Sequence, residues 1–236
     1  VFTWTAPHQG AGDIQFDVAA NATKGDGGNG GGDGSDQWNQ TSIILPQHGN
    51  HLALKCFIQG YYLGEGTMIP ALYNQGVSMD ANLTYSVQVQ LRDPLFPYNV
   101  IESQTAPLYM DGSTTATFQN SGSYYVSVQH RNAIAKWSAM PLLITGSQFY
   151  DFSTGPSAAY GSNEIETEPG IWAMFSGDLN QDENIDLLDL SVVEADINNF
   201  SFGYSASDLN GDGNVDLLDS PMLESNIASF VFSNHP

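Results

Sequence analysis

Between residues 51 and 145, apolar and polar residues alternate in short runs separated by clusters of Gly, Pro, Asn and Asp. In the clearest run, every second residue from Tyr85 to Leu91 is apolar, and the residues between them are Ser or Gln. This period of two predicts a strand with one buried and one solvated face. The same reasoning predicts five strands, at residues 52–59, 84–92, 114–119, 124–130 and 140–144. Several short strands with almost no helical pattern predict a mainly β chain with an immunoglobulin-like β-sandwich over residues 49–146.

Residues 1–48 carry a second strand pattern, which a glycine-rich stretch interrupts. Strands are expected at 1–7, 13–19 and 38–45, whereas residues 24–36 contain too many glycines for regular structure. The pattern, with Phe2-Thr-Trp-Thr-Ala-Pro and the later Gly-Asp, is similar to the closing strands of a reelin-type β-sandwich domain of secreted proteins. This resemblance implies that the earlier strands of such a domain are absent. We therefore predict that residues 1–45 complete a sheet by strand addition to another copy, another surface protein or a separate segment. The alternative is that they cover the 51–145 sandwich of the same chain.

Two helices are expected near the C-terminus, because apolar residues recur there at roughly helical intervals. The two sets are Leu190, Val193, Ile197 and Phe200, and Leu218, Met222, Ile227 and Phe230. We expect each set to form the core face of a short helix, and the two helices to pack on one another. Pro221 lies early enough in the second helix to be tolerated in its first turn. Residues 147–176, with several Pro and Gly, predict an extended connector between the sandwich and this module over 177–236.

A twelve-residue pattern of oxygen-bearing side chains precedes each expected helix and recurs thirty residues later. Positions 1, 3, 5, 7, 9 and 12 of the two copies are Asp178, Asn180, Asp182, Asn184, Asp186 and Asp189, and Asp208, Asn210, Asp212, Asn214, Asp216 and Asp219. Such spacing wraps a loop around one hard cation, with position 7 supplying its backbone carbonyl and position 9 often acting through water. An all-oxygen shell without His or Cys favours calcium over zinc. A merely solvated acidic run would not repeat this phase twice.

The duplicated loop and helix closely resemble the dockerin module, over about residues 177–232. The resemblance implies two calcium ions, one held by each set of six residues, and a cohesin-like receptor as partner. Asp at position 12 suits a dockerin better than an ordinary EF-hand, whose twelfth residue is usually Glu. Position 6 differs between the copies, because it is Gly213 in the second loop and Glu183 in the first. A left-handed residue other than glycine costs about 1–2 kcal/mol, so we expect the first site to bind calcium more weakly.

The charge of the chain is strongly acidic, with 26 acidic and five basic residues among 236. This balance argues against nucleic acid or an anionic membrane as partner and fits a chain that carries divalent cations. No apolar run is long enough to predict membrane insertion. Cys56 is the single cysteine, so no intrachain disulfide is possible, and we expect it to be buried. The start at Val1, without Met or a signal peptide, predicts a processed or truncated chain.

Motifs for catalysis are absent from the sequence: there is no nucleophile elbow, metalloprotease helix motif or phosphate-binding glycine loop. Five carboxylates are scattered through the predicted sandwich, namely Glu65, Asp80, Asp93, Glu102 and Asp111. A glycosidase requires two carboxylates that face each other across a cleft, and the sequence leaves such a pair open. We expect a protein that is not an enzyme.

Three functional hypotheses remain. The first, which we favour, is a calcium-stabilised extracellular structural or adhesive protein of the cell surface, such as a filament subunit. Residues 66–75 and 130–139 are similar to β-domains that precede dockerin-like ends in secreted bacterial surface proteins, which implies secretion. The second hypothesis is an interaction module that docks onto a cohesin-like receptor, and the third is a carbohydrate-binding accessory domain of a larger enzyme.

Positions 10 and 11 of the two loops discriminate between the first two hypotheses. They are Leu187 and Leu188 in the first copy and Leu217 and Leu218 in the second. Four exposed leucines would form an apolar patch, which monomers usually avoid. We therefore expect them to be buried against the sandwich or connector of the same chain, as an intramolecular clamp. Exposure of all four would favour the receptor instead.

Overall fold

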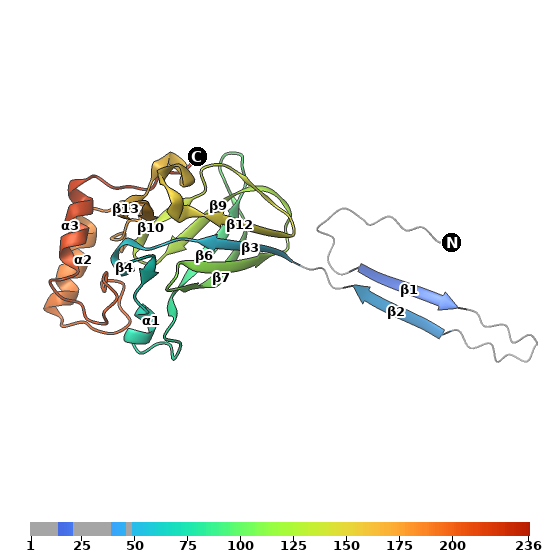
Figure 1. Cartoon of the computed structure of the whole chain (residues 1–236), viewed down its shortest axis with the longest axis horizontal. Coiled ribbons are helices and arrows are strands. Elements are labelled where there is room, and N and C mark those ends of the chain that lie inside the picture. The colour runs from blue at the N-terminus through green and yellow to red at the C-terminus, as the bar shows by residue number, and fades with distance from the viewer. Residues whose placement is uncertain (1–13, 21–38, 46–48) are drawn as a thin grey trace, which may run out of the picture. The chain divides into compact units, whose positions relative to one another are not determined.

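A computed structural model describes residues 14–20, 39–45 and 49–236 (Figure 1). The chain divides into two units, residues 1–48 and residues 49–236. In the first unit, β1 (Ile14–Ala20) pairs antiparallel with β2 (Asn39–Leu45), and Ile14 lies opposite Leu45. Both strands begin and end within one residue of the expected ranges 13–19 and 38–45. The strand expected at 1–7 and the glycine-rich stretch at 24–36 lie outside the described residues.

The second unit is built on two sheets that face each other across an apolar core. The larger sheet has the order β10-β9-β6-β7, with β11 also paired to β9, and the smaller has the order β12-β3-β8. All pairings are antiparallel except that of β12 with β3. The strands are β3 (Asn50–Lys55), β6 (Leu83–Arg92), β7 (Val100–Tyr109), β8 (Ser113–Phe118), β9 (Gly122–His130), β10 (Ala133–Trp137), β11 (Leu142–Ile144) and β12 (Ser147–Asp151). The expected mainly β sandwich is confirmed.

The core lies where the alternation in the sequence places it. The apolar residues of β6, from Tyr85 to Leu91, are all buried and contact apolar residues of the smaller sheet such as Leu52 and Phe118. One residue expected on the solvated face differs, because Gln90 is buried. Its Nε2 donates hydrogen bonds to side-chain oxygens of neighbouring glutamines at 2.8 and 3.2 Å, whereas its Oε1 is buried without a hydrogen-bond partner among the described residues.

Three strands of the two facing sheets were not expected from the sequence. β7 lies at the edge of the larger sheet, where Pro107 is tolerated because an edge strand leaves half of its N–H groups unpaired. β10 follows β9 as an antiparallel partner, and β12 adds a strand beside β3. The segment expected as a connector, 147–176, thus begins inside the sandwich. It continues through short 3₁₀ turns into a hairpin of β13 (Ile165–Glu168) and β14 (Ile171–Ala173).

Short elements between β3 and β6 form the end of the sandwich that meets the C-terminal module. They are β4 (Tyr62–Gly64), β5 (Thr67–Met68) and the one-turn helix α1 (Ala71–Asn74). At this end, Ile134 of β10 packs into the apolar core of the module. Gly60 approaches the module so closely that a Cβ there would overlap the carbonyl oxygen of Leu209. The sandwich and the module therefore form one packed unit.

The module contains α2 (Leu187–Asn198) and α3 (Ser220–Ala228), which lie side by side (Figure 1). Pro221 lies in the first turn of α3, as expected. Val193 and Leu223 are fully buried between the helices, but Phe200 and Phe230 are 86% and 83% exposed, so their assignment to the core is wrong. Each follows the last residue of its helix by two positions and has a positive φ, of 53° and 54°. The helix ends before reaching them, and the left-handed turn directs them away from its apolar face.

No helix of the described ranges is long and apolar enough to cross a membrane.

Candidate functional site: the duplicated loops and the surface beside them

The two twelve-residue loops fold in the same way, and the carboxylate at position 12 ties each loop together. One oxygen of Asp189 or Asp219 accepts hydrogen bonds from the backbone N–H groups of positions 2 and 3, at 2.8 and 3.2 Å in the first loop and 2.8 and 3.0 Å in the second. The other oxygen accepts from the N–H of position 9 at 2.9 Å in both. These matched contacts join the beginning of each loop to the helix that follows it.

Positions 3 and 5 wind each loop through local turns. The side-chain oxygen of position 3 accepts from the N–H of position 5 at 2.9 and 2.8 Å, and that of position 5 accepts from the N–H of position 7 at 3.0 and 2.8 Å. Asn and Asp are the residues that make such turns. In the first loop, hydrogen bonds from the Asn180 amide and from the Asn184 N–H lower the pKa of Asp182. That carboxylate is therefore charged at neutral pH.

Positions 4 and 6 have left-handed backbones in both loops. Gln181 and Glu183 have φ of 58° and 72°, and the corresponding Gly211 and Gly213 have φ of 76° and 93°. Glycine adopts this conformation freely, whereas other residues lose about 1–2 kcal/mol each. The first loop thus carries two strained positions and the second none. The weaker binding expected of the first loop stays a prediction.

The carboxylates at position 1 are buried and form no ion pair with any residue that the structure describes. Burial and, to a smaller extent, the nearby Asp189 and Asp182 carboxylates raise the pKa of Asp178 to about 7. Burial likewise raises the pKa of Asp219 to about 6 and that of Asp208 above its usual range. Asp178 Oδ1 is buried and has no hydrogen-bond partner among the residues that the structure describes. Buried carboxylates in this state favour a bound cation, because a positive charge would compensate their lost hydration.

The donor set fits a hard cation such as calcium. In the part of the chain that the structure describes, no three His, Cys, Asp or Glu side chains converge as a metal cluster by themselves. The loops instead combine Asp carboxylates with Asn oxygens and backbone carbonyls, which is the mixed oxygen shell that calcium takes. The twelve residues expected as ligands remain a prediction.

The leucines at positions 10 and 11 are exposed. Leu187, Leu188, Leu217 and Leu218 have 69%, 61%, 74% and 69% of their surface accessible, so the intramolecular clamp predicted for them is wrong. The N–H groups of the second leucine in each pair donate to the position-9 aspartates at 2.7 Å. These contacts fix the first pair in the first turn of α2 and the second pair in the turn that precedes α3. The module core is filled without them, by residues such as Val193 and Leu223.

Exposed phenylalanines extend this apolar surface. Phe230 and Phe232 line a groove of about 350 Å³ together with Leu187 and Ile227. A second groove, of about 400 Å³, lies between the helices and includes Leu217. We use the name leucine–phenylalanine surface for six exposed residues, namely Leu187, Leu188, Leu217, Leu218, Phe230 and Phe232. Phe230 was missed as a surface residue because its spacing fitted a helix face, and Phe232 was not singled out. A Phe-x-Phe triplet that recurs thirty residues apart, at 200–202 and 230–232, was the available signal.

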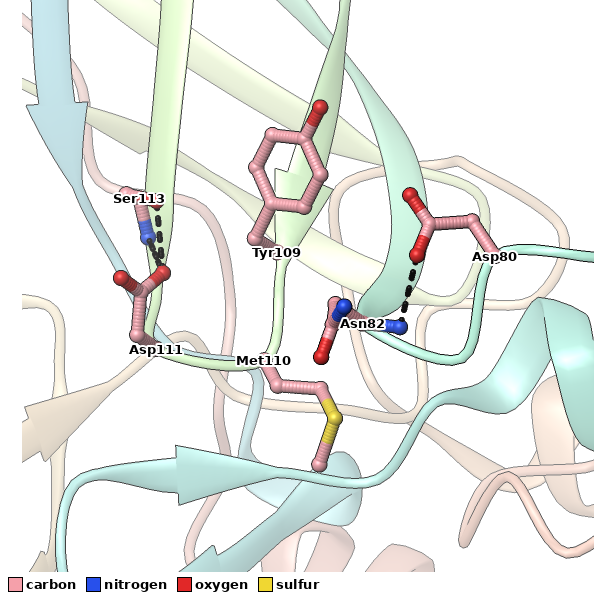
Figure 2. A pocket seen from close by; sticks show the side chains of 6 residues that line it. All are labelled: Asp80, Asn82, Tyr109, Met110, Asp111 and Ser113. Atoms are coloured by element: carbon pink, nitrogen blue, oxygen red, sulfur yellow. Dashed lines mark hydrogen bonds between the residues drawn. The ribbon is translucent and has the colours of Figure 1, made fainter.

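Two of the scattered sandwich carboxylates do meet at a pocket. Asp80 and Asp111 lie on opposite sides of a cavity of about 400 Å³, with Tyr109 and Met110 between them (Figure 2). Asp80 accepts from the N–H of Asn82, and Asp111 from the N–H and hydroxyl of Ser113. The Ser113 hydrogen bonds lower the pKa of Asp111. A glycosidase pair needs one carboxyl with a raised pKa, whereas the pKa of Asp111 is lowered. Both carboxylates act as turn caps.

Comparison with known proteins identifies the duplicated loops. Residues 176–228 match the family model of the dockerin type I domain. The C-terminal end of the chain is a dockerin module. Dockerins as a family bind calcium and are non-catalytic interaction modules. They occur in extracellular or cell-surface proteins. No curated protein matches the chain.

Two solved structures resemble the chain in fold. They are two interface mutants of a type II cohesin–X–dockerin complex from Acetivibrio cellulolyticus. Each matching chain is 15% identical, and the match covers 78% of this chain and 98% of that one, with TM-scores of 0.48 and 0.47.

Proposed function

We propose that this chain is a secreted interaction protein that docks through its dockerin module onto a cohesin-like receptor. The single observation that carries the proposal is the exposure of all four leucines at positions 10 and 11. They belong to corresponding positions of a duplicated unit; Leu187 shares one apolar groove with Phe230 and Phe232, and Leu217 lines the second groove, between the helices. Large exposed apolar surfaces of this kind mark interaction sites.

In this proposal two calcium ions hold the leucine–phenylalanine surface in shape. The first would be held by Asp178, Asn180, Asp182, Asn184, Asp186 and Asp189, and the second by Asp208, Asn210, Asp212, Asn214, Asp216 and Asp219. The pattern of position-12 hydrogen bonds supports equal roles for the two sets. The leucines follow the position-9 residue directly, so an ordered loop fixes where they stand. Calcium would also contribute much of the stability of such a small module.

The proposed function leaves the sandwich without chemistry of its own. Its carboxylate pair at Asp80 and Asp111 consists of turn caps, which supports a non-catalytic role for residues 49–176. We propose an extracellular location, where millimolar calcium can load the loops.

A binding experiment tests the docking role. The calcium-loaded protein is passed over a panel of immobilised type I and type II cohesin modules, and the variants Leu187→Ala/Leu188→Ala and Leu217→Ala/Leu218→Ala are compared with it. We expect at least one cohesin to bind, and a loss of about tenfold or more for one or both double variants, since buried apolar anchors dominate interfaces. Chelation should abolish binding. The matched control is Leu95→Ala/Leu143→Ala, which removes two exposed leucines of the sandwich. Equal binding by all variants would refute the assignment of the surface.

A second candidate function is self-association through residues 1–45. The observation that favours it is that β1 and β2 form a sheet of two strands, and isolated two-stranded sheets are marginally stable. Addition of β1 and β2 to a sheet of another copy or another surface protein would stabilise these strands. Repeated between copies, such contacts would build a filament, which is a structural or adhesive role. Deletion of residues 1–7 should then dissolve the native oligomer. A monomeric parent protein, or an oligomer that survives the deletion, would refute it.

A further inference from the structure

We infer that the β-sandwich positions Asp208, the first ligand of the second loop, through the side chain of Gln75, and thereby makes this loop the tighter of the two calcium sites. The inference rests on the proposed function, because it takes the second loop to bind calcium. It adds a residue from outside the dockerin module to the determinants of that site.

The decisive contact joins a sandwich amide to a loop carboxylate. Gln75 Nε2 donates to Asp208 Oδ2 at 2.6 Å, and both side chains are buried. Asp208 also accepts from the N–H of Gly211 on Oδ1, at 2.8 Å, and from the N–H of Gly213 on Oδ2, at 3.0 Å. A carboxylate has about four lone-pair sites. Three are therefore used, and one on Oδ1 remains for a cation.

The orientation of the Gln75 amide is itself fixed. Arg131 Nη2 donates to Gln75 Oε1 at 3.2 Å. Because a guanidinium only donates, it selects the oxygen end of the amide and leaves the nitrogen end for Asp208. Arg131 in turn lies over the rings of Tyr85 and Tyr204, at 4.7 and 4.2 Å from their centroids. The donor to Asp208 is thus held by packing as well as by a hydrogen bond.

Backbone contacts hold the rest of the second loop against the sandwich. Asn132 Nδ2 donates to the carbonyl oxygens of Ala206 at 3.0 Å and Asp208 at 3.5 Å. Asn74 Nδ2 donates to the carbonyl oxygen of Gly211 at 3.3 Å. These contacts restrict the backbone on both sides of the first ligand, so the loop is ordered before any ion arrives.

The first loop lacks this support. Within residues 49–236, the hydrogen bonds that reach residues 178–189 all come from the module itself. The corresponding carboxylate, on Asp178, has a buried Oδ1 without a hydrogen-bond partner. Groups that orient a metal ligand from outside the ligand shell typically change metal affinity by about 10- to 100-fold. The two loops therefore differ in a contact of the kind that sets affinity.

The test separates the two sites by silencing each in turn. Asp182→Ala removes position 5 of the first loop, so calorimetric titration with calcium chloride reports the second loop. Asp212→Ala removes position 5 of the second loop, so the same titration then reports the first loop. We expect Gln75→Leu to weaken calcium binding by about 10- to 100-fold in the Asp182→Ala background and by less than about threefold in the Asp212→Ala background. Arg131→Met, which releases the amide, should act in the same direction with a smaller effect.

Controls distinguish the possible failures. Gln148→Leu replaces an exposed glutamine of β12 and should leave both affinities unchanged. Circular dichroism at saturating calcium shows whether each variant is folded. Absence of calcium binding in Asp182→Ala with Gln75 intact would refute the proposed calcium function of the second loop. Two outcomes would overturn the role of Gln75. One is that Gln75→Leu leaves calcium binding by the Asp182→Ala protein unchanged, and the other is that it weakens both loops equally.

Discussion

The buried ion pair between Lys136 and Glu164 offers a sharp test of how the sandwich core is held. The two side chains are 1% and 0% exposed, and Lys136 Nζ contacts Glu164 Oε1 directly. The second carboxylate oxygen, Oε2, is buried without a hydrogen-bond partner. Lys136 Nζ also lies 5.4 Å from the centroid of the Phe152 ring. Removing either partner leaves an ionisable group in a buried site without its counter-charge.

The magnitude follows from the burial of both groups. Lys136→Met should lower the free energy of unfolding by about 3–5 kcal/mol, the usual cost of breaking a buried pair. Burial raises the pKa of Glu164, so the remaining carboxyl can protonate, which places the loss towards the lower end of that range. The double variant Lys136→Met/Glu164→Leu should lie within about 1 kcal/mol of the parent protein or exceed it, because apolar replacements need no counter-charge. The two changes should therefore be coupled by about 2–4 kcal/mol.

The assay is urea unfolding at saturating calcium, followed by tryptophan fluorescence. In a chain of this size about 1 kcal/mol shifts the Tm by roughly 2–4 °C, so thermal scans should show a loss of at least about 6 °C for Lys136→Met. Lys55→Met is the matched control, since Lys55 forms no ion pair within the described ranges. A loss below about 1 kcal/mol for Lys136→Met, or a double variant that loses the sum of two single variants, would refute the reasoning.

Three further changes test other parts of the fold. Burial lowers the pKa of His130 to about 3, whereas histidine in the unfolded chain titrates near about 6.5. The contribution of neutral His130 to the free energy of unfolding is therefore complete above about pH 6.5 and is lost as the pH falls towards 3. The loss should be about 2 kcal/mol at pH 5. His130→Phe should flatten the stability curve between pH 7 and 5, and parallel curves would contradict this. Glu183→Gly should stabilise the calcium-loaded module against urea by about 1 kcal/mol by removing a left-handed glutamate, and an unchanged midpoint would show that the strain is relieved elsewhere. Gly60→Ala should destabilise the protein by about 1–3 kcal/mol, because its Cβ would overlap the carbonyl oxygen of Leu209; differential scanning calorimetry that shows no change would mean that the module moves away freely.

Local periodicity was sufficient to predict most of the sandwich. Alternation placed the buried residues of β6 correctly, because in a strand with one buried face a period of two determines which residues face the core. It failed for β7, where Pro107 and several polar residues conceal an edge strand. It also failed for β12, whose parallel pairing with β3 joins segments about a hundred residues apart. Pairing partners of that kind are chosen by tertiary packing, which local sequence does not encode.

The two loops could be predicted because their contacts, unlike the pairing of distant strands, are local in the sequence. Their positions 1 to 12 are contiguous, so the residues that a cation needs are adjacent in the sequence and their phase can be read directly. The error lay in the leucines. An argument from avoided apolar surface predicted burial of Leu187 and Leu217, but other residues fill the module core and leave them exposed. The contacts of Gln75 and Asn132 with the second loop had no sequence signal, since they join residues more than seventy positions apart.

The difference between the two loops also explains how the module is oriented on the sandwich. Helices, loops and leucines are duplicated in the module, so each copy carries a similar loop that a reversed module would bring to the sandwich. The glycines break this equivalence. A Cβ on Gly211 would lie 2.8 Å from Ile69 Cγ2, and one on Gly213 would lie 3.1 Å from the carbonyl oxygen of Asn74. The first loop carries Gln181 and Glu183 at these two positions, so in a reversed module their side chains would collide with the same surface. The glycines at positions 4 and 6 thus serve two purposes, since they allow the left-handed turn and select the second copy for contact with the sandwich.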